Sequence, residues 1–367
     1  MFGLRGLRPD LEISGFETAF SEIAPRLVER GHAVTMYCRA SAHSRANRPA
    51  HADGVDLVYM PSPGGKNFSA VTSTGLAVAH ALARHRFDVW FFVNVGMGYH
   101  AATARLSGRP VVMNVDGLDW QRGKWGPVAR AYFRSAARMA VRFCTTLVTD
   151  AEAMRAFYRE HFGRESEMIP YGADIETSEQ SELVASLGLA PCDYYLIVSR
   201  LIPENSLEAM LSGFVRSRTK RRLVVVGDAN YQGAFHDSLE RIAASDARVQ
   251  MVGRISDQRL LKELWCNAYA YLHGHTVGGT NPALLRAMGY GSCVVARDTV
   301  FNREVLGDDG AYFADAESLT RLLDDLDVDA DRAARMRRLG PARIKERYTW
   351  DHVVDEYDRV LRAAVSA

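Results

Sequence analysis

Short apolar runs alternate with amphipathic stretches along almost the whole chain, and this alternation limits the folds that the chain can adopt. Strands buried on both faces of a parallel sheet read as continuous apolar runs, because helices cover the two faces. Two such series predict an α/β protein with two Rossmann-like domains. The predicted strands are Ala33–Tyr37, Val55–Met60, Val89–Val93, Val111–Val115 and Thr146–Thr149 in a first sheet, and Tyr194–Ser199, Leu223–Gly227, Val249–Val252, Ala268–Leu272 and Cys293–Ala296 in a second.

A break in this pattern separates the two series. At Ile169–Asp174 a proline and a glycine interrupt regular structure, and polar residues follow. We therefore expect an N-terminal domain at residues 1–170 and a second domain at residues 171–348. Residues 349–367 carry apolar side chains at helical spacing, which predicts a final amphipathic helix. The opening segment Met1–Leu4 is short for a buried strand, which leaves two alternatives: a short strand, or a natural chain that begins further upstream.

Composition narrows the class of protein. The chain has 367 residues, of which 47% are hydrophobic and 24% charged, and a net charge of +1 that gives no reason to expect a nucleic-acid partner. The five cysteines are scattered and odd in number, which favours reduced thiols over disulfides or a zinc site. No apolar run is long enough to span a bilayer, and the N-terminus has no apolar signal core. We expect a cytoplasmic protein without a metal site.

A glycine-rich turn followed by a helix start lies within His273–Met288. Gly278 and Gly279 allow the backbone to approach a ligand closely, because no Cβ stands in the way. Thr280 or Asn281 is a suitable N-cap, and the proline that follows suits the first position of a helix. Free amides at such a helix start favour phosphate binding, and the alternative is an ordinary strand-to-helix turn.

Two further loops have features of binding sites. A glycine, Gly15, opens a helix of clear apolar pattern, where Ser14 is a suitable cap and Glu17 follows it by three residues, as in a capping box. A plain cap is the alternative. Arg200 follows the first strand of the second series, and a guanidinium at the carboxyl end of a parallel strand suits phosphate binding. The alternative is a surface arginine.

In their order and spacing these segments resemble the retaining glycosyltransferases of the GT-B fold, and most closely the rhamnosyltransferase-like group of glycosyltransferase family 4. The resemblance covers nearly the whole chain. It implies two Rossmann-like domains whose parallel sheets face a central cleft, with the final helix crossing back to the first domain. The segments that carry it are Arg5-Gly6, Gly15-Phe16-Glu17, Asn114–Trp120, Ile169–Gly172, Ser199–Asn205, His273–Leu285 and Asn302–Leu306.

The resemblance implies an enzyme that moves a hexose or deoxyhexose, such as rhamnose from its dTDP donor, to a saccharide, lipid-linked or natural-product acceptor. The donor would bind mainly to the second domain and the acceptor to the first. Cleavage of the sugar–phosphate bond develops negative charge on the leaving diphosphate, and each fixed donor aimed at that charge supplies about 3–4 kcal/mol. An arginine and helix N-termini can do this without a metal ion, so the resemblance implies no metal and no cofactor besides the donor.

The resemblance also implies roles for single residues. Arg200 would neutralise the donor pyrophosphate, and Asp116 takes the place of a histidine or acid that lies near the anomeric carbon in relatives. Gly253 and Arg254 would flank the base of the nucleotide. The remaining substrate-binding residues that it implies are Arg5, Gly15, Phe16, Glu17, Asp119, Asn205, His273, His275, Gly278, Gly279, Thr280, Asn281 and Arg286.

Two positions depart from the family pattern. Arg286 stands where relatives keep a glutamate for the ribose hydroxyls, and Asn205 stands where a lysine is usual. A cation in place of an acceptor reverses the polarity of the hydrogen bond. The alternative to an enzyme is therefore a catalytically degenerate GT-B protein that binds or activates a partner. His273 and His275 also have a structural alternative, as hydrogen-bonded histidines of the fold.

A stripe of arginines indicates one more partner. Arg130, Arg134, Arg138 and Arg142 recur every four residues on a predicted helix. The stripe suits anionic lipid or a lipid-diphosphate acceptor, which would bring the protein to the inner face of the membrane; a solvated helix face is the alternative. An oxidoreductase is disfavoured, because the chain lacks a G-x-G-x-x-G turn after its first strand.

Overall fold

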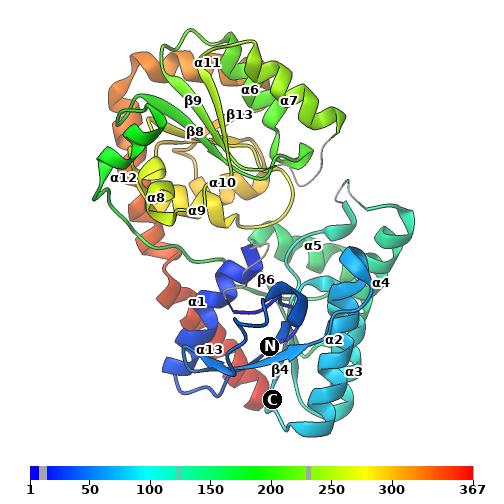
Figure 1. Ribbon diagram of the computed structural model, residues 1–367. Helices are drawn as coiled ribbons and strands as arrows, with labels where there is room; N and C mark the ends of the chain where they lie inside the picture. Colours follow the sequence, from blue (N-terminus) through cyan, green and yellow to red (C-terminus); the bar gives the residue numbers. More distant parts are fainter. Residues whose placement is uncertain (8–14, 122, 124, 229–232, 367) are drawn as a thin grey trace. The chain divides into compact units, whose positions relative to one another are not determined.

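The structure is a computed structural model that describes residues 1–7, 15–121, 123, 125–228 and 233–366 (Figure 1). The chain forms two compact units. The first consists of Met1–Gly172 together with Trp350–Ala367, and the second of Ala173–Thr349. In both units helices pack on sheets whose strands are mostly parallel.

The first unit contains two sheets. Strands β1 and β3 pair in parallel, whereas β2 is antiparallel to β3, so this sheet is mixed. The other sheet is parallel throughout. The sheet orders are β1 (Thr35–Arg39), β3 (Val55–Met60), β2 (His51–Ala52), and β4 (Trp90–Val93), β5 (Val111–Asn114), β6 (Thr146–Thr149), β7 (Glu167–Met168).

The opening segment of the chain joins these two sheets. The amide of Phe2 donates to the carbonyl of Phe91 at 2.9 Å, and the carbonyl of Phe2 accepts from the amide of Val93 at 2.9 Å. On its other side the amide of Tyr37 donates to the carbonyl of Met1 at 3.0 Å. The sequence predicts a single first sheet, whereas the structure has two. The opening segment, which lies between β1 and β4 in space, forms one isolated bridge in its described part, from Phe2 to Phe92, and no full strand joins the two sheets there.

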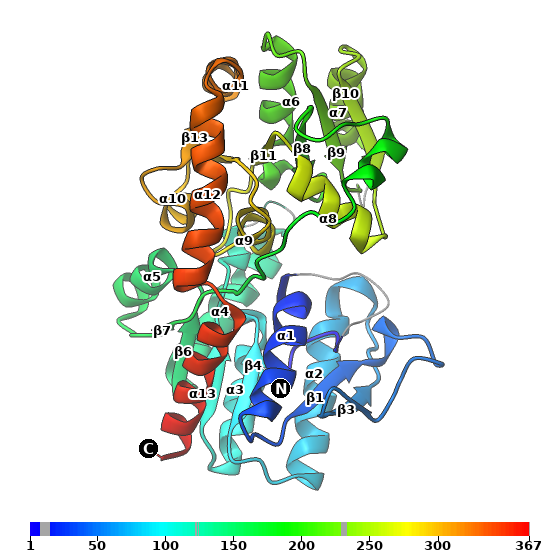
Figure 2. The ribbon, with the colours of Figure 1, turned by 90° about the vertical axis from the view of Figure 1, so that its left-hand side faces the viewer.

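Helices cover the sheets of the first unit, and the last helix of the chain is one of them. This helix, α13, lies along α1 (Figure 2). A guanidinium nitrogen of Arg30 lies 2.7 Å from the carboxylate of Asp355, and the rings of Phe20 and Tyr357 meet edge to face at 6.0 Å. The helices are α1 (Gly15–Glu29), α2 (Gly65–Arg84), α3 (Gly98–Ala104), α4 (Pro127–Phe143), α5 (Glu152–Phe162) and α13 (Trp350–Ser366).

The second unit contains one six-stranded parallel sheet. Its order is β10 (Val249–Gly253), β9 (Arg222–Val226), β8 (Tyr194–Val198), β11 (Ala270–His273), β12 (Val294–Arg297) and β13 (Ala311–Phe313). The helices are α6 (Leu207–Arg216), α7 (Ala234–Ala244), α8 (Gln258–Asn267), α9 (Pro282–Gly289), α10 (Val300–Leu306), α11 (Ala316–Val328) and α12 (Ala330–Arg347). No helix in the described part of either unit is long and apolar enough to cross a membrane.

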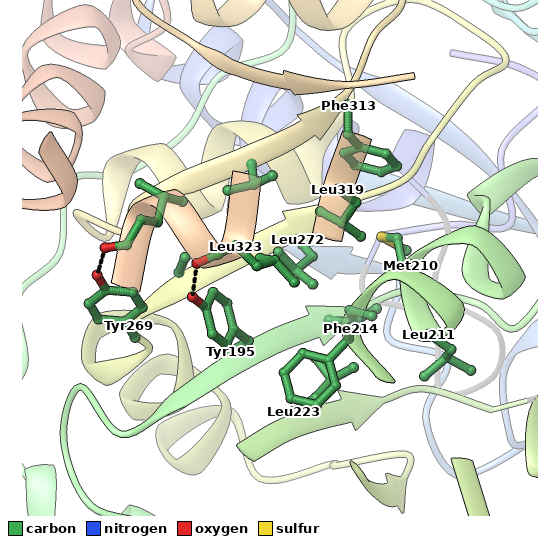
Figure 3. Close-up of a cluster of buried hydrophobic side chains, with 14 of the residues drawn as sticks. Tyr195, Met210, Leu211, Phe214, Leu223, Tyr269, Leu272, Phe313, Leu319 and Leu323 are labelled. Carbon is green, nitrogen blue, oxygen red and sulfur yellow. Dashed lines mark hydrogen bonds between the residues drawn. The ribbon is translucent and has the colours of Figure 1, made fainter. Parts of the chain in front are cut away.

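The core of the second unit lies between β8 and the helices α6 and α11. Phe214 and Leu319 are fully buried there (Figure 3). Tyr195 and Tyr269 place their rings in the same cluster, and their hydroxyls donate to the carbonyls of Leu323 and Leu326 in α11. A buried tyrosine hydroxyl needs such a partner, so α11 is fixed to the sheet by polar as well as apolar contacts.

The chain passes from one unit to the other at residues 172–173 and returns at residues 349–350. Within the first unit Gly172 packs against Trp350, where a Cβ on the glycine would lie 2.5 Å from the indole ring. Within the second unit the amide of Ala173 donates to the carbonyl of Tyr348 at 2.8 Å. The two crossings therefore lie side by side.

Candidate functional site

The glycine-rich segment forms a loop between β11 and α9 in the second unit. Gly278 has a φ of +109°, a backbone conformation that residues with a Cβ rarely adopt. Asn281 is the N-cap of α9, and its side chain accepts a hydrogen bond from the amide of Ala283 at 2.9 Å. Of the two predicted caps the structure selects Asn281; Thr280 is buried beside it. The loop ends on a capped helix N-terminus, as the sequence predicts.

This loop is fastened to the loop that follows Arg200. The carbonyl of Glu204 accepts from the amide of Thr276 at 3.0 Å and from its hydroxyl at 2.8 Å. Gly274 packs so closely on Asn205 that a Cβ would lie 2.1 Å from the carbonyl oxygen of Asn205. The structure therefore brings the two predicted phosphate-binding segments of this unit together at the carboxyl ends of β8 and β11.

Asn205 is the central link between these loops. Its side chain is buried, donates to the carbonyl of Arg200 at 2.8 Å, and contacts Nδ1 of His275 at 2.9 Å. Asn302 in α10 adds a second brace, because its side-chain Nδ2 donates to the carbonyls of His275 at 3.1 Å and Arg297 at 2.8 Å. Sequence reasoning included Asn302 in a family motif but missed this bracing role.

His273 ends β11 and lies beneath the loop. Its side chain is buried, and Nδ1 lies 3.4 Å from the hydroxyl of Tyr271. Burial, with a smaller contribution from His275, lowers the pKa of His273 to about 3, so the ring is neutral at physiological pH. Its Nε2 has no hydrogen-bond partner among the described residues.

Arg286 in α9 points toward α8. Its guanidinium carbon lies 5.4 Å from the ring centroid of Trp265. Arg286, Trp265 and Tyr290 line a pocket of about 280 Å³ together with Gln258, Arg259, Leu261 and Lys262. Lys262 forms ion pairs with Glu176 and Glu179, whereas Arg286 has no ion-pair partner among the described residues.

The last predicted position in this unit is the loop after β10. Gly253 ends that strand with a φ of +70°, and its carbonyl accepts from the amide of Gly227 at 2.9 Å. Arg254 follows and is exposed. In the sheet order β10 lies two strands from β8, so Gly253 and Arg254 belong to the same carboxyl edge as the loops of Arg200 and His275, but farther along it.

In the first unit the predicted residues gather around the start of α1. The amide of Arg5 donates to Oε1 of Glu17 at 3.1 Å, and its guanidinium lies 3.4 Å from Oε2. Glu17 is buried, so this contact fixes the turn after the opening segment. The expected cap at Ser14 lies outside the described residues. Gly15 begins α1, and the Phe16 ring meets Tyr171 edge to face at 6.5 Å.

The two aspartates after β5 differ in their surroundings. Asp116 is partly exposed, its amide donates to Oδ1 of Asn114 at 3.1 Å, and its carboxylate accepts from the hydroxyl of Tyr171. Asp119 is buried and accepts from Nδ2 of Asn94 at 3.0 Å. Asn94 itself has a φ of +76°, an unusual backbone conformation of the kind that gathers at functional sites. Sequence reasoning missed both Asn94 and the bond to Tyr171.

Two sequence families cover most of the chain. The family described as Glycosyltransferase Family 4 matches residues 13–177, and the family described as Glycosyl transferases group 1 matches residues 193–326. The first match falls mainly on the first unit and the second match on the second. No curated protein matches the chain in sequence.

Solved structures share the fold over almost the whole length of the chain. HepE from Anabaena, in complex with UDP, is 18% identical, with a TM-score of 0.77 and 98% of each chain covered. Sucrose-phosphate synthase from Thermosynechococcus elongatus is 15% identical, with a TM-score of 0.78, 96% of this chain and 94% of that one. A glycosyltransferase from Rickettsia africae is 13% identical, with a TM-score of 0.75 and 97% of both chains. These likenesses confirm the predicted α/β architecture of two Rossmann-like halves, which is the GT-B fold.

Proposed function

We propose, from the premise that this chain belongs to the glycosyltransferases of the GT-B fold, that it transfers a hexose or deoxyhexose from a nucleoside-diphosphate sugar. The acceptor is a saccharide, a lipid-linked sugar or a natural product. The observation that carries the proposal is the junction of the Arg200 loop with the glycine-rich loop before α9. The order of the sequence motifs supports retention of the anomeric configuration and rhamnose, from dTDP-rhamnose, as the transferred sugar.

The chemistry at this junction is charge stabilisation. When the bond from the anomeric carbon to the phosphate oxygen breaks, negative charge develops on the diphosphate. The Arg200 guanidinium and the amides of Gly278–Asn281 meet that charge, with the positive end of α9 behind them. The acceptor oxygen forms the new bond to the anomeric carbon, and its proton passes to the leaving phosphate. This scheme needs no metal ion from the protein.

The other predicted residues take supporting roles in the proposal. Asp116 lies near the anomeric carbon, and Gly15 lies against the diphosphate from the first unit. Gly253 and Arg254 flank the base. The HepE structures, which contain UDP and UDP-glucose, support a nucleoside diphosphate as the common part of the donor. We include peripheral contact with an anionic membrane through α4 in the proposal.

A second candidate is a GT-B protein that binds a partner and does not transfer sugar. Two observations favour it. Arg286 offers a cation to the pocket beside α9, where relatives offer a glutamate, and Asn205 uses its side chain within the fold. Turnover separates the two candidates, because a degenerate protein releases no nucleoside diphosphate from any donor.

The test is release of nucleoside diphosphate from a panel of nucleotide sugars that includes UDP-glucose and dTDP-rhamnose. We expect slow hydrolysis of at least one donor, and we expect Arg200→Gln to lower kcat by about a hundredfold or more. Arg222→Gln is the matched control, because Arg222 is the first residue of β9 and lies at the amino-terminal ends of the strands, away from the Arg200 loop at their carboxyl ends. The proposal would be contradicted if the protein turned over no donor in the panel and calorimetry detected no binding of any nucleotide.

A further inference from the structure

The carboxylate of Asp116 is held by a tyrosine from outside its own loop. Tyr171 is buried, and its hydroxyl donates to Oδ2 of Asp116. Burial raises the pKa of Tyr171 well above its usual value, with further contributions from the carboxylates of Asp116 and Asp150. The hydroxyl is therefore protonated at physiological pH, and it donates to the carboxylate.

The backbone of Asp116 is held as well. Its amide donates to Oδ1 of Asn114 at 3.1 Å, and Nδ2 of Asn114 donates to the hydroxyl of Tyr357 at 3.2 Å. Asn114 and Tyr357 are both buried, so each of these bonds replaces water that the groups would otherwise need. Asp116 thus has one brace on its side chain and another on its main chain.

Both braces involve a tyrosine from a segment next to a crossing between the units, Tyr171 directly and Tyr357 through Asn114 of β5. Tyr171 is followed by Gly172, the last residue before the first crossing, and Tyr357 lies in α13, which begins at Trp350 directly after the second crossing. Gly172 and Trp350 are packed against each other. The orientation of Asp116 therefore depends on residues outside the β5 loop as well as on Asn114.

We propose that Tyr171 is a positioning residue for the transfer reaction, which aims the Asp116 carboxylate by a hydrogen bond from the segment that leads into the second unit. This inference rests on the proposed function, because it gives Tyr171 its role through Asp116. It adds a residue that the sequence motifs treat as part of a domain boundary. Tyr171 also contacts Phe16, so the first turn of α1 shares the same support.

The competing explanation is that Tyr171 only fills space, in which case its ring matters and its hydroxyl does not. Tyr158 in α5 provides the comparison within the same unit. Its side chain is fully buried and interacts electrostatically with Asp119 and Asp116, but its hydroxyl has no hydrogen-bond partner among the described residues. The two tyrosines differ in the one bond that the inference invokes.

The experiment compares Tyr171→Phe with Tyr158→Phe in the full-length protein. For Tyr171→Phe we expect kcat to fall about tenfold or more while the KM for the donor stays within about twofold, because orientation is lost and donor binding is not. The acidic limb of the pH profile of kcat should move to higher pH, because a hydrogen bond to the charged carboxylate favours ionisation. Tyr158→Phe should match the wild type in all three quantities.

The groups that face Asp116 determine how this profile is read. Among the described residues, the hydroxyls of Tyr158, Tyr171 and Tyr357 interact electrostatically with Asp116, and Asp119 and Asp150 interact with the same tyrosines. Burial raises the pKa values of all three tyrosines, so none of their hydroxyls titrates within the acidic limb. Identical kcat and identical acidic limbs for the two variants would overturn the inference and leave the proposed function intact.

A second measurement keeps the inference separate from the proposed function. In protein labelled with ¹³C at the aspartate carboxyls, Asp116→Asn identifies the Asp116 signal, and its titration is compared between wild type and Tyr171→Phe. A shift of that titration to higher pH in Tyr171→Phe supports the positioning role even in a protein that hydrolyses no donor. An unchanged titration overturns it, whatever the turnover.

Discussion

At the scale of single residues, Asn205 gives a physical reason for one departure from the family pattern. An asparagine amide can donate and accept at once, whereas a lysine ammonium can only donate. Asn205 uses both abilities, toward the carbonyl of Arg200 and toward the ring of His275. The substitution therefore exchanges a charge for a link between two loops. Arg286, in contrast, keeps its charge at the rim of a pocket.

The charge of Arg286 leads to the first prediction at this scale. The family resemblance places Arg286 among the substrate-binding residues, so under the proposed function Arg286→Glu reverses a charge beside the donor and kcat/KM for the donor should fall about tenfold or more. Arg216→Glu makes the same charge change at an exposed position at the end of α6 and should leave kcat/KM within about twofold. A gain of activity in Arg286→Glu would instead favour the degenerate candidate. Steady-state release of nucleoside diphosphate measures both.

At the scale of elements, the strands of four or more residues were largely predictable from the sequence, whereas the strands of two or three residues were not. Val55–Met60 and Thr146–Thr149 match β3 and β6 to the residue. The three-residue strand β13 and the two-residue strands β2 and β7 were not predicted, because runs this short carry no periodicity.

The site shows the same limit. The helix start at Asn281 follows from local capping chemistry, so the sequence predicts it. The bonds of Asn205, Asn302 and Tyr171 join residues that lie far apart in the sequence, and no local pattern encodes them. The family motifs identify the segments that contain these residues, but they do not predict which side chains form hydrogen bonds with each other.

Helix α4 carries the prediction at the scale of elements. Its exposed arginines Arg134, Arg138 and Arg142 have no ion-pair partners within the described chain. We expect cosedimentation with vesicles rich in phosphatidylglycerol at low salt. Arg→Gln at all three positions should weaken binding by about 1 kcal/mol per charge removed.

The matched control for α4 is removal of the same charge from another helix. Arg332, Arg335 and Arg338 lie on α12, and their triple change to glutamine should leave vesicle binding unchanged under the proposal. Equal losses in the two triple variants would mean that net charge alone attracts the protein, and the proposal for α4 would then be wrong. Binding of the wild type to neutral vesicles should be weak at any salt concentration.

At the scale of the whole molecule, the entry into the second unit is fastened to its body by one carboxylate. Glu263 in α8 is buried and accepts from the Ser178 hydroxyl at 2.6 Å and from the amides of Glu179 at 2.9 Å and Gln180 at 3.0 Å. Burial alone would raise the pKa of Glu263, but these bonds, together with one from Asn267, outweigh it and lower the pKa.

A pH dependence of stability follows from this carboxylate. A depressed pKa means that Glu263 stabilises the folded state above its unfolded pKa of about 4.3 and that this stability is lost as the pH falls through the lower folded value. Glu263→Gln should therefore reduce the free energy of unfolding by about 1–3 kcal/mol at pH 7 and by less at pH 3. Thermal or urea unfolding across this range measures it. The exposed Glu317→Gln should show no such pH-dependent loss.

The packing of Gly172 on Trp350 has a consequence for how such a chain is built. An ideal Cβ on Gly172 lies 3.1 Å from the Cα of Trp350. The two residues that flank the second unit in the sequence are therefore in contact within the first unit. Topologically, everything from Ala173 to Thr349 is an insert with both ends leaving from one spot. A gene in which a short linker replaced that insert would keep the remaining backbone path almost unbroken, as tolerated domain insertions require.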